Sequence, residues 1–368
     1  MEMRGRRKVK KLLNRSVLFV ASLFAVFLFS GALFADEMEK EIALGKKVSA
    51  EIEKMWEPVT DPAQNARLRM LLERLLPHTT RPLPYEVRIV RENMTNAFSL
   101  PGGIVYFTTG MIDFLRTDAE IAAILAHELV HADRRHVMIQ SARASKISLA
   151  ALVLMVASQG AVGPMILTSL AQVAVTNSYS KDLEREADKE GFRMLVAAGF
   201  PPAAMITSLE AMIFDQMKRP YVDPGVYMTH PELSERVEYL LQLAKEMNRP
   251  IHRKHALNLL RPAIVETGDT LLLTIDGEEV WRTPSGEEGR ALLQKAVETI
   301  KTFFQMETPP YDIQTLDLNG KRTLRIGHAL VAQEPLPERT PSLEHLRSAL
   351  VRALGAALGK HRNVRYHR

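Results

Sequence analysis

The fold is decided by one stretch, residues 117–145, which reads TDAEIAAILAHELVHADRRHVMIQSARAS. Thr117 and Glu120 have the spacing of a capping box, a pattern with which many helices begin. Apolar residues then recur at helical intervals, so we predict one helix over the whole stretch. Within it, His127-Glu128-Leu129-Val130-His131 places two histidines four residues apart.

Histidines at this spacing point to nearly the same side of a helix, because four residues make about one turn. Both imidazoles can therefore bind one metal ion, with Glu128 close enough to reach a water molecule on that ion. The pentapeptide alone is suggestive, since its alternative is a pair of core or surface histidines. Catalytic zinc keeps three protein ligands and one open position, so a third ligand must come from elsewhere. The chain has no cysteine, so that ligand is a histidine or a carboxylate.

Candidates for the third ligand lie on a second predicted helix, over 177–199. There Asp182-Leu-Glu184-Arg-Glu186-Ala-Asp188 places Glu184 and Asp188 four residues apart on one face. Glu184 can bind a metal ion while Asp188 fixes the tautomer of a histidine ligand by hydrogen bonding. The spacing neither selects nor rejects Glu186, and an acidic helix by itself is more often a solvated surface.

Four motifs in a fixed order resemble a known protease family. In chain order they are Asn96-Ala-Phe-Ser-Leu-Pro-Gly-Gly103 with Val105-Tyr106 and Thr109-Gly110, the HExxH pentapeptide, Asn177-Ser-Tyr-Ser180 with Glu184-x-x-Ala-Asp188, and Thr229-His-Pro-Glu-Leu-Ser-Glu-Arg236. The order, over residues 38–248, resembles the gluzincin metallopeptidases that include the CAAX prenyl protease, HtpX, the Oma-type protease, BepA and LoiP. With one leader and no set of membrane spans, the chain resembles their secreted, BepA- and LoiP-like branch.

The resemblance implies one zinc ion per chain, bound by His127, His131 and Glu184. It also implies that Glu128 is the general base and that Asp188 orients a zinc-bound histidine. Zinc would lower the pKa of its water, and Glu128 would take the proton and later deliver it to the leaving amine.

Two further residues carry over from the last motif. His230 matches a family histidine near the metal, which either occludes the ion as a switch or stabilises the transition-state oxyanion. Arg236 matches an arginine with a structural or supporting role. The strand predicted over 103–108 would pair with an extended substrate through main-chain hydrogen bonds. The expected substrate-binding residues are Asn96, Ala97, Phe98, Gly103 and Val105.

The remaining pattern is mainly helical with few strands, and so predicts an α+β fold. Helices are predicted over 38–56, 61–76, 117–145, 177–199, 202–218, 233–248, 287–305 and 342–358, and strands over 85–90, 103–108, 270–282, 311–318 and 323–326. The resemblance adds that the larger part is a zincin protease domain with a small β-sheet. We expect a leader over 1–35, the metallopeptidase domain over 36–250, a linker over 251–267 and a small α+β domain of unassigned role over 268–368. No internal repeat is found.

The leader joins seven basic residues to the apolar run Val17–Phe29, which is typical of a secretory signal peptide. Leu33 at the expected −3 position is unusual, so an uncleaved anchor is the alternative. Either way the rest of the chain crosses the inner membrane, to the periplasm or the outer face of that membrane. The apolar stretch 147–175 is interrupted near Gly160, which favours two helices packed on the protein or a membrane over a spanning hairpin.

The basic balance of the chain belongs to this leader. Seven basic residues and one acidic residue give residues 1–35 a charge of +6, against +5 for the whole chain, so the remainder carries −1. A nearly neutral body excludes a nucleic-acid-binding surface of the usual basic kind.

These observations predict a zinc-dependent metalloendopeptidase that hydrolyses unfolded or misassembled cell-envelope proteins. One alternative is a chaperone-like or adaptor protein whose zinc site is latent or closed by His230. Another is an assembly module at the membrane surface, with incidental histidines. Turnover distinguishes the first two, and stoichiometric zinc excludes the third. The oligomeric state is not predicted.

Overall fold

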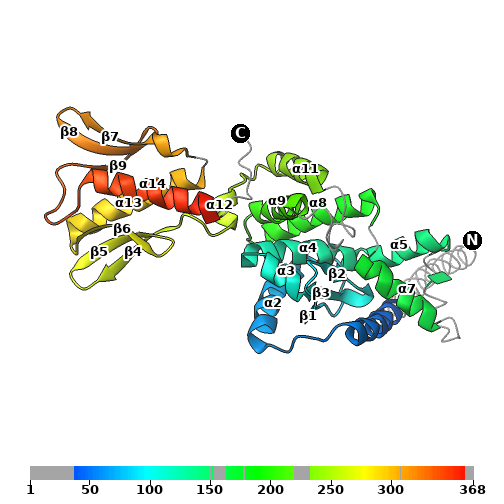
Figure 1. The fold of residues 1–368 in the computed structure, drawn as a ribbon. Helices are drawn as coiled ribbons and strands as arrows, with labels where there is room; N and C mark the ends of the chain where they lie inside the picture. Colours follow the sequence, from blue (N-terminus) through cyan, green and yellow to red (C-terminus); the bar gives the residue numbers. More distant parts are fainter. Residues whose placement is uncertain are drawn as a thin grey trace, which may run out of the picture.

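The computed structural model describes residues 37–148, 151–152, 163–176, 179–218, 233–306 and 308–360 (Figure 1). The leader and His230 lie outside these residues. The helices are 37–55, α2 (Pro62–Leu75), α3 (Thr109–Phe114), α4 (Asp118–Asp133), α5 (His136–Ser145), α7 (Gly163–Thr176), α8 (Lys181–Ala197), α9 (Ala203–Lys218), α11 (Leu233–Glu246), α12 (Arg253–Ala256), α13 (Glu287–Gln305) and α14 (Leu343–Lys360). With three small sheets, this confirms the mainly helical α+β fold.

A three-stranded sheet lies beside the metal-binding helix. Its strands are β1 (Glu86–Val90), β2 (Ala97–Ser99) and β3 (Ile104–Thr108), in the order β1-β3-β2. The central strand β3 pairs in parallel with β1 and antiparallel with β2. The expectation that β3 accepts a substrate strand is therefore wrong, because both of its edges are already hydrogen-bonded. The edge strands of this sheet are β1 and β2. The sequence pattern did not predict β2, which has only three residues.

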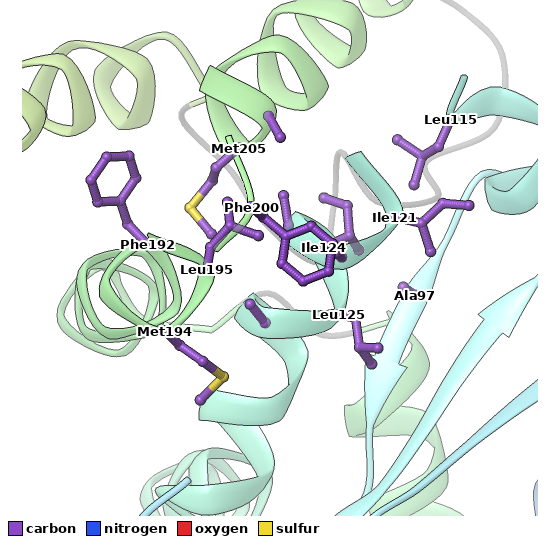
Figure 2. Packing of buried hydrophobic residues seen from close by; sticks show 14 of the residues in the cluster. Ala97, Leu115, Ile121, Ile124, Leu125, Phe192, Met194, Leu195, Phe200 and Met205 are labelled. Carbon is purple, nitrogen blue, oxygen red and sulfur yellow. The ribbon is translucent and has the colours of Figure 1, made fainter. Parts of the chain in front are cut away.

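Helices cover both faces of this sheet. Along β3, Val105 and Phe107 join a core formed with α2, α4, α8 and α9, whereas Ile104 and Tyr106 join a second core with the helix 37–55, α5 and α7. This alternation is the two-residue period of a strand buried on both sides. Figure 2 shows the strand with Ala97 on one side of α4, near Leu125, and α8 with Met194 and Leu195 on the other side. Helix α4 is thus held between the sheet and α8.

The predicted helix over 117–145 is two helices, α4 and α5. It begins as expected, because the Thr117 hydroxyl accepts a hydrogen bond from the Glu120 N–H and the Glu120 carboxylate accepts one from the Arg116 N–H. It breaks at Arg135, whose φ of 60° is left-handed. The break brings Arg135 Nε to 2.8 Å from an oxygen of Glu41, which is 1% exposed. A buried carboxylate is stable only when it is paired, and Arg81 pairs with the same carboxylate. A sequence window over one helix contains neither of these contacts.

Helix α7 covers part of the apolar stretch 147–175. Leu170, Ala171 and 173–175 are buried in the second core, so this part packs on the protein itself. Among the described residues, no helix is both long and apolar enough to span a bilayer. Contact with a membrane remains a prediction.

The C-terminal part consists of two similar units, each of three strands followed by a helix. Its strands are β4 (Pro262–Thr267), β5 (Thr270–Ile275) and β6 (Glu278–Pro284), followed by α13, and then β7 (Ile313–Leu318), β8 (Lys321–Ile326) and β9 (Ala329–Gln333), followed by α14. The first three strands begin at 262, 270 and 278, and the next three at 313, 321 and 329, each 51 residues later. In each unit, the pairing of the middle strand with the third strand shifts register at the equivalent residue, which is Leu273 in β5 and Leu324 in β8.

The two units share one core and exchange helix contacts. Helix α13 packs on β4 of its own unit and β9 of the other, and α14 packs on β7 and β6 in the same way. The core is built mainly of residues from 260 to 357 and is distinct from the two around the first sheet. The expectation of no internal repeat is therefore wrong for this part of the chain. The two units share the order and spacing of their strands, but few identical residues. The predicted linker 251–267 contains α12 and β4.

Candidate metal centre

The centre is built where α4 and α8 pack side by side. His127 and His131 lie on α4, and Glu184 lies one turn into α8. The helices approach closely because α8 has a glycine at the contact: a Cβ on Gly191 would lie 3.1 Å from the backbone nitrogen of His127. Such a contact is tighter than most Cβ contacts in proteins, so a side chain here would push the helices slightly apart. The glycine thus permits the close separation that brings Glu184 to the histidines.

The three predicted ligands converge. The Nε2 atoms of His127 and His131 are 3.0 Å apart, and the Glu184 carboxylate oxygens lie 3.6 Å from the first and 3.4 Å from the second. All three side chains are buried, and their ligand atoms lie within 4.8 Å of one another. Among the described residues, one group of histidines and carboxylates has metal-binding geometry, and it consists of these three ligands.

The donor set fits zinc. Two imidazole nitrogens and a carboxylate oxygen are common ligands of catalytic zinc, at bonds of about 2.1 Å. Tetrahedral ligands at that bond length are about 3.4 Å apart, close to the three separations seen here. Burial lowers the pKa of His131 to about 4, so its ring is neutral at pH 7, the form that binds a metal ion.

The other ring nitrogen of His127 is held by Asp188, as expected. Its Nδ1 lies 3.0 Å from Asp188 Oδ1. Arg236 donates hydrogen bonds to both oxygens of Asp188, from Nε at 2.8 Å and Nη2 at 2.7 Å, and the Tyr239 hydroxyl donates a further one. Although burial opposes ionisation, Arg236 and His127 hold the pKa of Asp188 well below its usual range. A charged Asp188 favours a proton on His127 Nδ1, which leaves Nε2 free for a metal ion.

Arg236 also reaches the third ligand. Its Nη1 lies 3.2 Å from Glu184 Oε2, and its side chain is buried. The expected supporting role of Arg236 thus has a physical form: this single cation pairs with two buried carboxylates of α8.

Glu128 follows His127 directly on α4 and is 1% exposed. It lies inside the protein beside the metal ligands, as a general base for a sheltered water molecule would. His230, the other expected catalytic residue, lies outside the described residues.

Two residues around His131 were not predicted. The ring of Tyr179 stacks on His131, with centroids 4.0 Å apart, and His136 contacts its edge. His136 follows His131 by five residues, a spacing that would place it on another face of a continuous helix. The break at Arg135 turns His136 toward His131. A pattern of residue spacing along one continuous helix could not predict this contact.

The expected substrate-binding residues lie around β2 and β3, and all are buried. Val105 is on the central strand beneath the helices, and Gly103 precedes it. Asn96 precedes β2, and its side-chain amide donates a hydrogen bond to the Val175 carbonyl of α7 at 3.2 Å. Ala97 and Phe98 belong to β2 itself, next to α4. Of the set, Ala97 and Phe98 lie on an edge strand; whether any of them binds substrate stays a prediction.

We expect Gly191→Ala to weaken metal binding without unfolding the protein. The added methyl group pushes α8 from α4 at His127 by a few tenths of an ångström, which moves Glu184 away from both histidines. A loss of about tenfold in zinc affinity follows if the ligand moves outside its optimal geometry. Chelator competition measures the affinity. Gly355→Ala, where a Cβ meets no atom within 4 Å, is the matched control and should bind zinc as the wild type does.

Comparison with known proteins places this centre in a family. Residues 62–244 match the profile of peptidase family M48. The chain is 27% identical to the beta-barrel assembly-enhancing protease of Escherichia coli (strain K12) over 224 residues, which cover 58% of this chain and 43% of the relative. It is 30% identical to the mitochondrial metalloendopeptidase OMA1 of Arabidopsis thaliana over 162 residues (44% and 32%), and 32% identical to that of Danio rerio over 173 residues (45% and 36%). The chain thus spans less than half the length of these relatives.

Proposed function

Because residues 62–244 form a peptidase family M48 domain, we propose that the chain is a zinc-dependent metalloendopeptidase that hydrolyses unfolded or misassembled proteins of the cell envelope. The observation that carries this proposal is the convergence of His127, His131 and Glu184 beside a buried Glu128. The relatives named above are metalloendopeptidases or proteases by name, which supports the same reaction class.

The residues have distinct tasks in this reaction. A bound zinc ion would acidify a water molecule and polarise the peptide carbonyl. Glu128 takes the proton from the attacking water and returns it to the leaving amine nitrogen. Asp188 and Arg236 keep the His127 ring in one tautomer and orientation.

The substrate would bind in extended form along β2. In the described part of the chain, β2 pairs with β3 on one side and with no strand on the other. Helix α7 also contacts β2. An added strand binds mainly through backbone hydrogen bonds, which accept many sequences. This mode suits the unfolded chains that a quality-control protease must accept.

The envelope location rests on the leader and on one relative. The N-terminal segment has the pattern of a secretory signal or an anchor, and the Escherichia coli relative is named for the assembly of β-barrel proteins. Both support a protease on the far side of the inner membrane, facing proteins of the envelope.

Removal and return of the metal test the proposal. We expect the full-length protein to contain about one zinc ion per chain and to cleave an unfolded model protein. A zinc chelator should reduce the rate by roughly a hundredfold or more, because the polarising ion is lost. Adding zinc back should restore it.

Controls separate the possible outcomes. Circular dichroism should show that the metal-free protein is still folded. Zinc near one per chain with no turnover would favour a chaperone-like or adaptor protein, and cleavage by the zinc-free protein would refute the metallopeptidase mechanism.

A further inference from the structure

His136 occupies an unusual place beside the metal centre. It is the first residue of α5, directly after the left-handed Arg135, and its side chain is fully buried. Its Nδ1 lies 2.9 Å from Nδ1 of His131, and the two rings meet edge to face at 81°. The backbone break therefore brings a third histidine ring into hydrogen-bonding contact with a metal ligand.

The proton positions in this contact follow from chemistry. His131 directs Nε2 toward His127 and Glu184, so that nitrogen must keep its lone pair if it binds a metal ion. A neutral ring then carries its proton on Nδ1. At 2.9 Å, the acceptor of that proton is Nδ1 of His136. A nitrogen that accepts has no proton, so the proton of His136 is on its Nε2.

A carboxylate stands at the far side of His136. Glu186 Oε2 lies 3.6 Å from His136 Nε2, and the other oxygen of Glu186 is 3.5 Å from Arg134 Nε. At 3.6 Å the contact is too long for a hydrogen bond. The negative charge nevertheless favours a proton on the nearer nitrogen, Nε2, which is the tautomer that His131 requires.

We infer that His136 is the positioning residue for the metal ligand His131, with Glu186 favouring the tautomer in which His136 accepts. The inference rests on the proposed function in one respect, since it takes His131 to bind the metal ion. The two histidine ligands are then held by different chemistry: Asp188 holds His127 with a charged acceptor, and His136 holds His131 with a neutral one.

The negative charge of the site explains why a neutral group, His136, accepts the hydrogen bond from His131. Asp188, Glu184 and Glu128 already place three buried carboxyl groups around the ligands, and Arg236 pairs with two of them. A fourth carboxylate at position 136 would need another cation in the same buried space. An imidazole accepts the hydrogen bond without adding charge.

Three substitutions of His136 test the inference through zinc affinity. The amide oxygen of His136→Asn comes near the position of Nδ1 and can accept from His131, whereas His136→Leu has no acceptor. The amide of His136→Gln reaches toward Nε2 instead. We expect the Leu and Gln variants to bind zinc about 10 to 100 times more weakly, and the Asn variant to stay within about threefold of the wild type.

The measurements need no turnover. Chelator competition gives the zinc dissociation constant, and the visible spectrum of the cobalt-substituted full chain reports ligand geometry. It should change in the Leu and Gln variants and be preserved in the Asn variant. Met138→Leu, equally buried on α5, is the matched control and should match the wild type in both.

The outcomes separate the inference from the proposed function. Wild-type zinc affinity in the Leu variant, or equal losses in the folded Asn and Gln variants, would overturn the role of His136 while leaving the zinc site intact. If the Leu variant does not fold, the difference in zinc affinity between the Asn and Gln variants still tests the role of His136. A wild-type protein that binds no zinc would overturn the proposed function, and this inference with it.

Discussion

Glu128→Gln is expected to abolish proteolysis while the fold and zinc content stay as in the wild type. Glutamine has nearly the shape of glutamate but cannot take a proton from the attacking water. Glu128 is 1% exposed, so bulk water cannot easily replace it as the base. Since general acid–base groups contribute about 10²–10⁴ in rate, we expect the cleavage rate of an unfolded model protein to fall about a thousandfold.

The control for this prediction lies on the same helix. Glu120 of α4 is also a buried carboxylate, 2% exposed, but it caps the start of the helix. Glu120→Gln keeps an oxygen for that hydrogen bond and should retain turnover. Zinc analysis and thermal unfolding of both variants show whether the site and the fold survive. Cleavage at the wild-type rate by Glu128→Gln would exclude this residue as the base.

The parts of the site that the sequence could predict are local. His127 and His131 share a helix, so one turn of regular geometry relates them. The helix predicted over 61–76 likewise begins where expected, because the Asp61 carboxylate accepts hydrogen bonds from two backbone N–H groups at the start of α2. Glu184 is different, because spacing did not exclude Glu186. The family resemblance chose between them, and the structure places Glu186 3.6 Å from His136, outside the group of ligands.

The parts that the sequence did not predict depend on distant contacts. At the break, Arg135 contacts the buried Glu41, which is far along the chain, and the next residue, His136, contacts His131. The strand β2 has three residues, too few for an alternating pattern, so the sequence did not indicate that β3 has a neighbouring strand on each side. In the C-terminal part, the shared 51-residue spacing becomes visible once the strands themselves are known.

Replacing Arg236 by methionine is expected to lower the free energy of unfolding of the metal-free protein by about 3–5 kcal/mol, since removing one partner of a buried ion pair has a cost of this size. Arg236 is 5% exposed and lies within 3.2 Å of both Asp188 and Glu184. Methionine of similar length fills the space but leaves these two carboxylates buried without their cation. Urea denaturation measures the loss. Arg193→Met, at an exposed ion pair with Glu190, is the matched control and should change stability by less than about 1 kcal/mol.

The loss of stability in Arg236→Met should also depend on pH and on bound zinc. In the wild type, the pKa of Asp188 is depressed in the folded state, so its stabilising contribution is present at neutral pH and is lost as the pH falls through that low value. Without Arg236 its pKa should rise, and the deficit in stability should shrink on acidification as the buried carboxylate takes a proton. Bound zinc should shrink it too, because its positive charge compensates Glu184, which has lost its cation in the variant but not in the wild type. A deficit that is the same at every pH, with and without zinc, would mean that Arg236 acts by packing alone and not by balancing the charge of the metal centre.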